Sequence, residues 1–338
     1  MNTPNITIPN ITIPKLNTIN QTSFDLSNLH TPSTVLVLGN GFDLDLNMAT
    51  SYNSFAHDKD FWPFKDDGQY GPLSLPYFLN KNIDDVESWF DLEELLAKYA
   101  NLRKATDKCI VKKDIAYLEE LKSSLVAYLK KQEDTFVSNL RSNTHAKRET
   151  PSRCVLERIL DRTLEKENVS IYTFNYTDIS RISHEIILNT KAHFNHVHGS
   201  INSKGIVLGT GDSKEINDDY FPFYKSASKN YKSSNLVEDL LNADSVYIFG
   251  HSLGENDHDY FSEFFKMATK SRKKAFVYDK IKLRIFTYDD NSELDIKKQL
   301  MKLTDKHLIG LYAHCDFKIL KTALSYQSDW MNDDSEVW

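Results

Sequence analysis

The stretch Thr34 to Phe42, TVLVLGNGF, decides the fold, because an apolar run passes directly into Gly39-Asn40-Gly41. A short apolar run ending in glycine is typical of a buried parallel strand that feeds a tight turn and a helix. Ligands of open α/β sheets bind at the carboxyl ends of the strands. Polar clusters at four predicted strand ends therefore indicate one site. The other three clusters are TFNYT at 173–177, HVHGS at 196–200 and FGHSLGEND at 249–257.

Strand-like and helix-like segments alternate along most of the chain. This alternation predicts an α/β fold with a mainly parallel, Rossmann-like sheet and helices on both faces. After the first strand, we expect strands over 169–174, 193–198, 206–208, 245–249 and 283–288. We expect helices over 178–188, 230–241, 257–269, 292–303 and 317–326.

Three regions are predicted along the sequence. Residues 1–30 contain NITIP twice and are interpreted as a disordered arm, with an edge strand or a partner-binding arm as the alternative. Residues 31–330 form one α/β nucleotide-binding domain, and a helical insertion over 83–166 follows its first strand. Ser152 is the predicted N-cap of the last helix in that insertion. The helical spacing predicts that Trp89, Leu92, Leu95 and Leu96 are buried and that Asp91 and Glu93 lie on the polar side.

Composition narrows the class of protein. The 338 residues carry a net charge of −7, so nucleic acid is not the expected partner. The three cysteines fit a reducing cytoplasm and show no metal-ligand spacing. No apolar run approaches the roughly 20 residues that a membrane-spanning helix needs, and no secretory signal is recognised.

The first turn is a candidate nucleotide-binding element. Gly39, Asn40 and Gly41 are expected to present backbone N–H groups to a phosphate or a ribose hydroxyl. Asp43 would repel phosphate and is therefore expected to accept a hydrogen bond from a hydroxyl or a base. The alternative is a plain turn in which Asp43 complements the helix dipole.

Candidate catalytic residues follow three later strands. Asn175 can position a water or a sugar hydroxyl, or it can cap the next helix. A neutral His198 can act as a base, whereas His196 is expected to pack deeper in the fold. Two histidines without an acidic or cysteine partner at short spacing make a metal site the less favoured interpretation. His251 and Asp257 complete the predicted rim.

Two glycine turns complete the predicted binding set. Gly209 lies in a turn of the sequence GTGD, and Gly250 and Ser252 lie in GHSLG. The GHSLG run also matches the G-x-S-x-G pattern of a nucleophile elbow. In that alternative, a serine hydrolase would use Ser252 with an acid and a histidine. The candidates in chain order are Asp289, Asp290, His307 and His314.

Taken together, these motifs resemble the AbiH family of bacterial phage-resistance, or abortive infection, proteins. The resemblance implies antiphage defence and covers residues 33–320. It also implies that Asp91 or Glu93 could reach toward the site, with a salt bridge on the helix as the favoured alternative. The matching motifs are VLVLGNGFDLDLNMATSY at 35–52, WFDLEELL at 89–96, TFNYTD at 173–178, HVHGS at 196–200, VLGTGD at 207–212 and VYIFGHSLGENDHDYF at 246–261.

The order of motifs also resembles sirtuin-like domains, which bind NAD. That resemblance implies a nucleotide hydrolase, with NAD as the most concrete substrate or ligand. The first turn departs from the sirtuin pattern, and a zinc-binding cysteine module is missing, so protein deacylation is not expected. The alternative is a non-catalytic nucleotide sensor or a partner-binding protein. A phage-derived trigger or partner protein and self-association are both compatible with the sequence.

Overall fold

The computed structural model describes residues 33–65, 68–85, 89–103, 108–142, 150–164, 168–187, 192–203, 205–232, 234–271, 280–323 and 325. The predictions for residues 1–30 and for the side chains of Trp89 and Asp91 lie outside this description. In the described part, no helix combines the length and apolar character that crossing a bilayer requires.

Six parallel strands form the central sheet, and their order is β3-β2-β1-β6-β7-β8. Counted along the chain, this order is 3-2-1-4-5-6, which is the order of a Rossmann fold. Two further strands, β4 and β5, form a separate antiparallel pair. The strands are β1 (Ser33–Leu38), β2 (Asn168–Thr173), β3 (Phe194–His196), β4 (Gly199–Ser200), β5 (Gly205–Ile206), β6 (Ser245–Phe249), β7 (Ile281–Thr287) and β8 (Cys315–Lys321).

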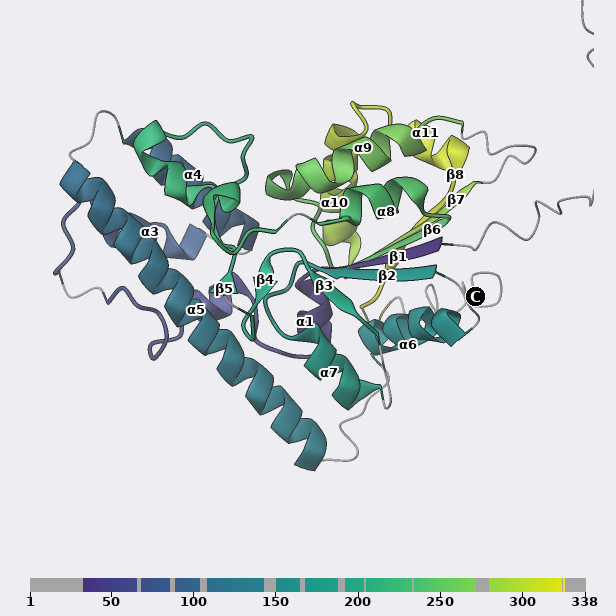
Figure 1. The fold of residues 1–338 in the computed structure, drawn as a ribbon, viewed down its shortest axis with the longest axis horizontal. Coiled ribbons are helices and arrows are strands. Elements are labelled where there is room, and N and C mark those ends of the chain that lie inside the picture. The colour runs from purple at the N-terminus through teal and green to yellow at the C-terminus, as the bar shows by residue number, and fades with distance from the viewer. Residues whose placement is uncertain are drawn as a thin grey trace, which may run out of the picture. The chain divides into compact units, whose positions relative to one another are not determined.

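Helices cover both faces of this sheet (Figure 1), as the alternation predicts. The helices of the sheet layers are α1 (Gly41–Asp45), α6 (Pro151–Leu164), α7 (Ile179–Ile186), α8 (Leu236–Asn242), α9 (His258–Ala268), α10 (Asp290–Leu303) and α11 (Ile309–His314). The remaining helices are α2 (Tyr52–Ala56), α3 (Leu75–Lys81), α4 (Trp89–Leu102) and α5 (Lys108–Ser142). Short 3-10 turns are η2 (Ile83–Asp85), η4 (Asp218–Phe223), η5 (Lys225–Ala227) and η6 (Glu255–Asp257).

The alternation of side chains along β1 divides the sheet between two cores. Val35 and Val37 pack into the core beneath α8, α9, α10 and α11. Leu36 and Leu38 point to the opposite face and pack with α1, α6 and α7. A strand that is apolar on both faces is what a sheet covered on both sides requires.

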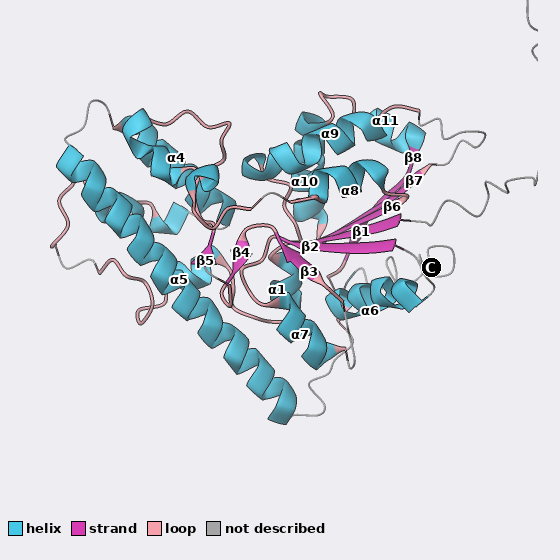
Figure 2. Ribbon diagram, in the orientation of Figure 1, coloured by secondary structure: helices cyan, strands magenta, loops and turns pink. Residues whose placement is uncertain are grey.

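A third core holds together the helical region, which Figure 2 shows as a group of helices beside the sheet. Most of its buried members come from α2, α3, α4, α5 and η4. Asp114 of α5 connects several of these elements, because its carboxyl group accepts hydrogen bonds from the Tyr99 and Tyr220 hydroxyls, both at 2.7 Å. Among the described residues between 83 and 142, all but Arg103 lie in α4, α5 or the 3-10 turn η2. Helix α6, which the predicted bounds of the insertion include, contacts β2 of the sheet.

Four local predictions were wrong. The segment predicted as a helix over 317–326 contains strand β8, and 206–208 contributes only Ile206, to the separate pair. Ser152 is not the cap of α6, because Thr150 Oγ1 accepts the Arg153 N–H. Glu93 is buried instead of lying on a polar side.

Candidate functional site

Strands β1 and β6 are neighbours at the point where the strand order changes direction. The loops that follow them contact each other closely because both contain glycines at the contact. The Gly39 N–H donates to the Phe249 carbonyl and the Gly41 N–H donates to the Gly250 carbonyl, both at 2.9 Å. A Cβ on Gly39 would lie 2.5 Å from His251 Cα. The expectation that both glycines present free N–H groups to a phosphate was therefore wrong, since main-chain carbonyls already occupy them.

Asp43 is likewise engaged inside the protein. Its two carboxyl oxygens accept hydrogen bonds from Asn175 Nδ2 at 3.0 Å and from Thr177 Oγ1 at 2.7 Å. Burial raises the pKa of Asp43 to about 7, although both hydrogen bonds lower it. Asn40 also has an internal partner, because its Oδ1 accepts the Thr50 hydroxyl at 2.8 Å. The Asp43 carboxyl thus orients Asn175.

His198 and His251 approach the same carboxylate. The distance from His198 Nε2 to Asp257 Oδ1 is 3.3 Å, and that from His251 Nε2 to Asp257 Oδ2 is 3.6 Å. The ring of Phe174 packs against both imidazoles, with centroid distances of 5.0 and 4.3 Å. His251 Nδ1 accepts the Leu253 N–H at 2.9 Å, so the proton of a neutral His251 lies on Nε2 and faces Asp257.

Burial and the positive charge of Lys225 determine the protonation states of His198 and Asp257. Burial, helped by the charge of Lys225, lowers the pKa of His198 to about 4, so the ring is neutral at pH 7. Burial opposes ionisation of Asp257, but Lys225 and His198 outweigh it and hold its pKa well below the usual range. His198 is 4% exposed and more buried than His196, so the expectation that His196 lies deeper was wrong.

Lys225, which is not among the predicted residues, and Glu93 connect the site to the helical region. Lys225 Nζ lies 2.9 Å from Glu93 Oε1 and 3.0 Å from Asp257 Oδ1. The other oxygen of Glu93 accepts Asn256 Nδ2 at 3.0 Å. No motif surrounds Lys225, whereas Glu93 lies within the quoted WFDLEELL run, which was the available signal.

The turn that contains Gly209 holds the Lys225 segment in place. The Thr210 N–H donates to the Phe223 carbonyl at 2.8 Å, and the Lys225 N–H donates back to the Thr210 carbonyl at 2.9 Å. A Cβ on Gly209 would lie 2.3 Å from the Phe223 oxygen, so this approach requires glycine. The predicted binding residue Gly209 therefore positions Lys225 through the backbone.

The buried polar residues around Asp43, Asp257 and Glu93, called the cluster below, include three polar atoms that have no hydrogen-bond partner. They are Asn175 Oδ1, His198 Nε2 and Asn256 Oδ1. The contact of His198 with Asp257 is close enough for an ion pair, but it is not aligned as a hydrogen bond. Since buried polar atoms are usually paired, unpaired ones mark places where a water or a ligand would bind.

The nucleophile-elbow alternative requires a histidine close to Ser252, and neither of the two predicted histidines lies close to it. Ser252 follows the carboxyl end of β6 and is exposed. His314 directly precedes β8 at the amino edge of the sheet, where Cys315 pairs with Ile281. The two residues are thus separated by a strand length, roughly 15–20 Å. Gly310, which packs on the end of α9 at Thr269, also contacts His307 and so places that histidine at the amino edge. The positions of His307 and His314 therefore argue against the serine-triad alternative that uses either of them.

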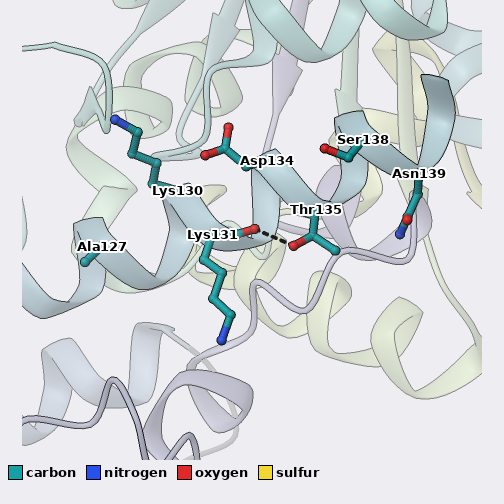
Figure 3. A pocket seen from close by; sticks show the side chains of 7 residues that line it. All are labelled: Ala127, Lys130, Lys131, Asp134, Thr135, Ser138 and Asn139. Carbon is teal, nitrogen blue, oxygen red and sulfur yellow. Dashed lines mark hydrogen bonds between the residues drawn. The ribbon is translucent and has the colours of Figure 1, made fainter. Parts of the chain in front are cut away.

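A metal centre and a surface groove are two other kinds of site that a protein of this class can carry. Among the described residues, no group of three or more His, Cys, Asp or Glu side chains could hold a metal ion. A groove lies along α5 (Figure 3), and none of the candidate site residues lines it. Its lining residues are Ala127, Lys130, Lys131, Asp134, Thr135, Ser138 and Asn139.

The sheet order and the cluster define an α/β protein of the Rossmann type with a buried polar site at the carboxyl edge of its sheet. Residues 35–279 match the family model described as Bacteriophage abortive infection AbiH. This match covers well over half of the chain, so the protein belongs to the AbiH family of bacteriophage abortive infection proteins. No curated protein matches the sequence.

Proposed function

We propose that the protein acts in phage defence by binding and hydrolysing a nucleotide, with NAD cleaved at its nicotinamide–ribose bond. The observation that carries the proposal is the pairing of a neutral, incompletely bonded His198 with an ionised Asp257 at the carboxyl edge of a Rossmann sheet. A base and an anion in one buried place are the two groups that such a hydrolysis needs. The choice of NAD rests on the sirtuin-like resemblance.

The chemistry assigns different tasks to these residues. Nicotinamide leaves with the electron pair of the glycosidic bond and becomes neutral, so its departure requires no acid. Positive charge then develops on the ribose, and the Asp257 carboxylate stabilises it. A water adds its oxygen to the anomeric carbon and gives its proton to His198. Asn175 positions the water or a ribose hydroxyl, and His251 orients Asp257 through Nε2.

The test measures turnover directly. Purified protein is incubated with NAD, and separately with mixed nucleoside triphosphates, alone and with a lysate of phage-infected cells that supplies a trigger. Release of nicotinamide or a base is followed by chromatography. We expect NAD cleavage in at least one condition and none by a folded His198→Ala variant. Cleavage of neither substrate class in any condition contradicts the proposal.

A second candidate function is non-catalytic nucleotide sensing. The burial of the cluster favours it, since His251, Asn175 and Asn256 are only 5–6% exposed. A closed site is better suited to a ligand that stays bound than to a substrate that must enter and leave in every catalytic cycle. Saturable binding without product in the same assay would favour this function.

A further inference from the structure

We propose that Asn175 and Asn256 form two hydrogen-bond acceptors that recognise the hydroxyl- or amino-bearing part of the ligand, so that the protein binds a nucleotide through its nucleoside moiety and not through its phosphates. The inference rests on the proposed function only in taking the ligand to be a nucleotide. It adds Asn256, and through it Glu93 of the helical region, to the ligand-binding residues.

A carboxyl group fixes the orientation of the Asn175 amide. Asp43 Oδ1 accepts Asn175 Nδ2 at 3.0 Å, and Asp43 Oδ2 is occupied by the Thr177 hydroxyl. The reversed amide would place its oxygen against a carboxylate oxygen, which also accepts. Asn175 Oδ1 therefore points away from Asp43, and it is left buried without a partner.

Asn256, which directly precedes Asp257, repeats this arrangement with Glu93 in place of Asp43. Its Nδ2 donates to Glu93 Oε2 at 3.0 Å, while Lys225 holds Glu93 Oε1 at 2.9 Å. Its Oδ1 is likewise buried and unpartnered. A Cβ on Gly211 would lie 3.3 Å from this oxygen, so any larger residue at position 211 would crowd the acceptor.

The chemistry of these orphan atoms discriminates between parts of a nucleotide. An amide oxygen needs a donor, which ribose hydroxyls and base amino or amide groups supply and ionised phosphates do not. Leaving such an acceptor buried and unpaired is unfavourable, and a donor from the ligand would remove this cost. The charge of the site also disfavours a phosphate, because among the described residues Lys225 is the one cation paired with both Asp257 and Glu93. The Gly39 and Gly41 N–H groups, which could have held phosphate, are already bonded.

Ligand competition on the full-length protein tests the inference without any variant. Binding is measured by calorimetry for NAD, nicotinamide riboside, the four common ribonucleosides and inorganic pyrophosphate. We expect at least one phosphate-free nucleoside to bind within tenfold of NAD, and pyrophosphate to leave that binding unchanged. Pyrophosphate that displaces the nucleoside, or binding of no nucleoside at all, overturns the inference.

A matched pair of variants locates the acceptor. Asn256→Leu keeps the size of the side chain but removes its oxygen, and it should weaken nucleoside binding roughly tenfold. Asn202→Leu is the control, because Asn202 also donates to a carboxylate, that of Asp178 at 3.0 Å, but is exposed. Equal binding by folded Asn256→Leu and wild-type protein contradicts the inference. Nucleoside binding without NAD cleavage would contradict the proposed hydrolysis but would leave this inference intact.

Discussion

Gly41 and Gly250 touch backbone to backbone at the point where β1 and β6 end. A Cβ on Gly41 would lie 2.5 Å from Gly250 Cα, and the Gly41 N–H donates to the Gly250 carbonyl at 2.9 Å. Gly250 also has φ of +63°, a conformation that glycine adopts more readily than other residues. Because neither glycine has a side chain, two loops separated by about 200 residues of sequence can approach closely enough for their backbones to make contact.

Gly41→Ala should destabilise the protein because the added methyl group collides with backbone that cannot rotate away. We expect the free energy of unfolding, measured by urea denaturation, to fall by about 1–3 kcal/mol or more. Gly71→Ala is the control, since a Cβ there meets nothing within 4 Å. A Gly41→Ala protein as stable as Gly71→Ala would show that the two loops can separate at little cost.

His198→Ala should abolish phage protection and NAD turnover while the protein remains folded. Loss of a general base lowers the rate by about 10²–10⁴-fold. Ser252→Ala is the matched control on an exposed side chain of the same edge, and it should retain activity. The assignment fails if folded His198→Ala protects cells fully. It also fails if Ser252→Ala is inactive and a covalent serine-directed probe labels Ser252.

Lys225→Met should cost considerably more stability than a change at a surface lysine. Lys225 is 4% exposed and pairs with Glu93 and Asp257, so its removal leaves two buried carboxyl groups without their cation. We expect a loss of about 3–5 kcal/mol by urea denaturation. Lys214→Met is the control: Lys214 also bridges two acids, Glu94 and Glu255, but these side chains are 48% and 36% exposed. That change should cost about 1 kcal/mol or less, and equal losses would argue against a buried ion network.

The sheet was predictable because its strands are short apolar runs with clear turns. Strand β8 was missed because Phe317, Leu320 and Leu324 recur at helical spacing, although the strand uses Cys315 and Phe317 on one side. The strand ends identified His198 and Asn175, since side chains at one sheet edge must lie near one another.

The partners of those side chains were not predictable. Lys225 reaches Asp257 only because the 209–211 turn bonds to the segment around residue 225. Such a contact between loops leaves no periodic signal in the sequence. Glu93 looked like a surface charge of an amphipathic helix, and only the packing of α4 shows that it is buried.

The contribution of His198 to stability should depend on pH with a defined sign. Its pKa is about 4 in the folded protein, below the usual 6.5, because burial and Lys225 disfavour the charged ring. Between these values the unfolded chain binds a proton that the folded protein rejects, so stability rises with pH over this window. The free energy of unfolding of wild type minus that of His198→Ala should therefore rise from pH 4 to 6.5, by at most about 1.4 kcal/mol per pH unit, and be flat above it.

His57 supplies a control of opposite sign for this measurement. Hydrogen bonds to the Asn53 carbonyl and to Asp84 raise the pKa of this exposed histidine. Its contribution is present below the unfolded pKa and is lost as pH rises through the folded value. The difference between wild type and His57→Ala should therefore fall with increasing pH. Urea unfolding at half-unit steps from pH 4 to 8 separates the two trends. A His198→Ala difference that falls or stays constant between pH 4 and 6.5 would mean that the folded protein does not disfavour the charged ring of His198.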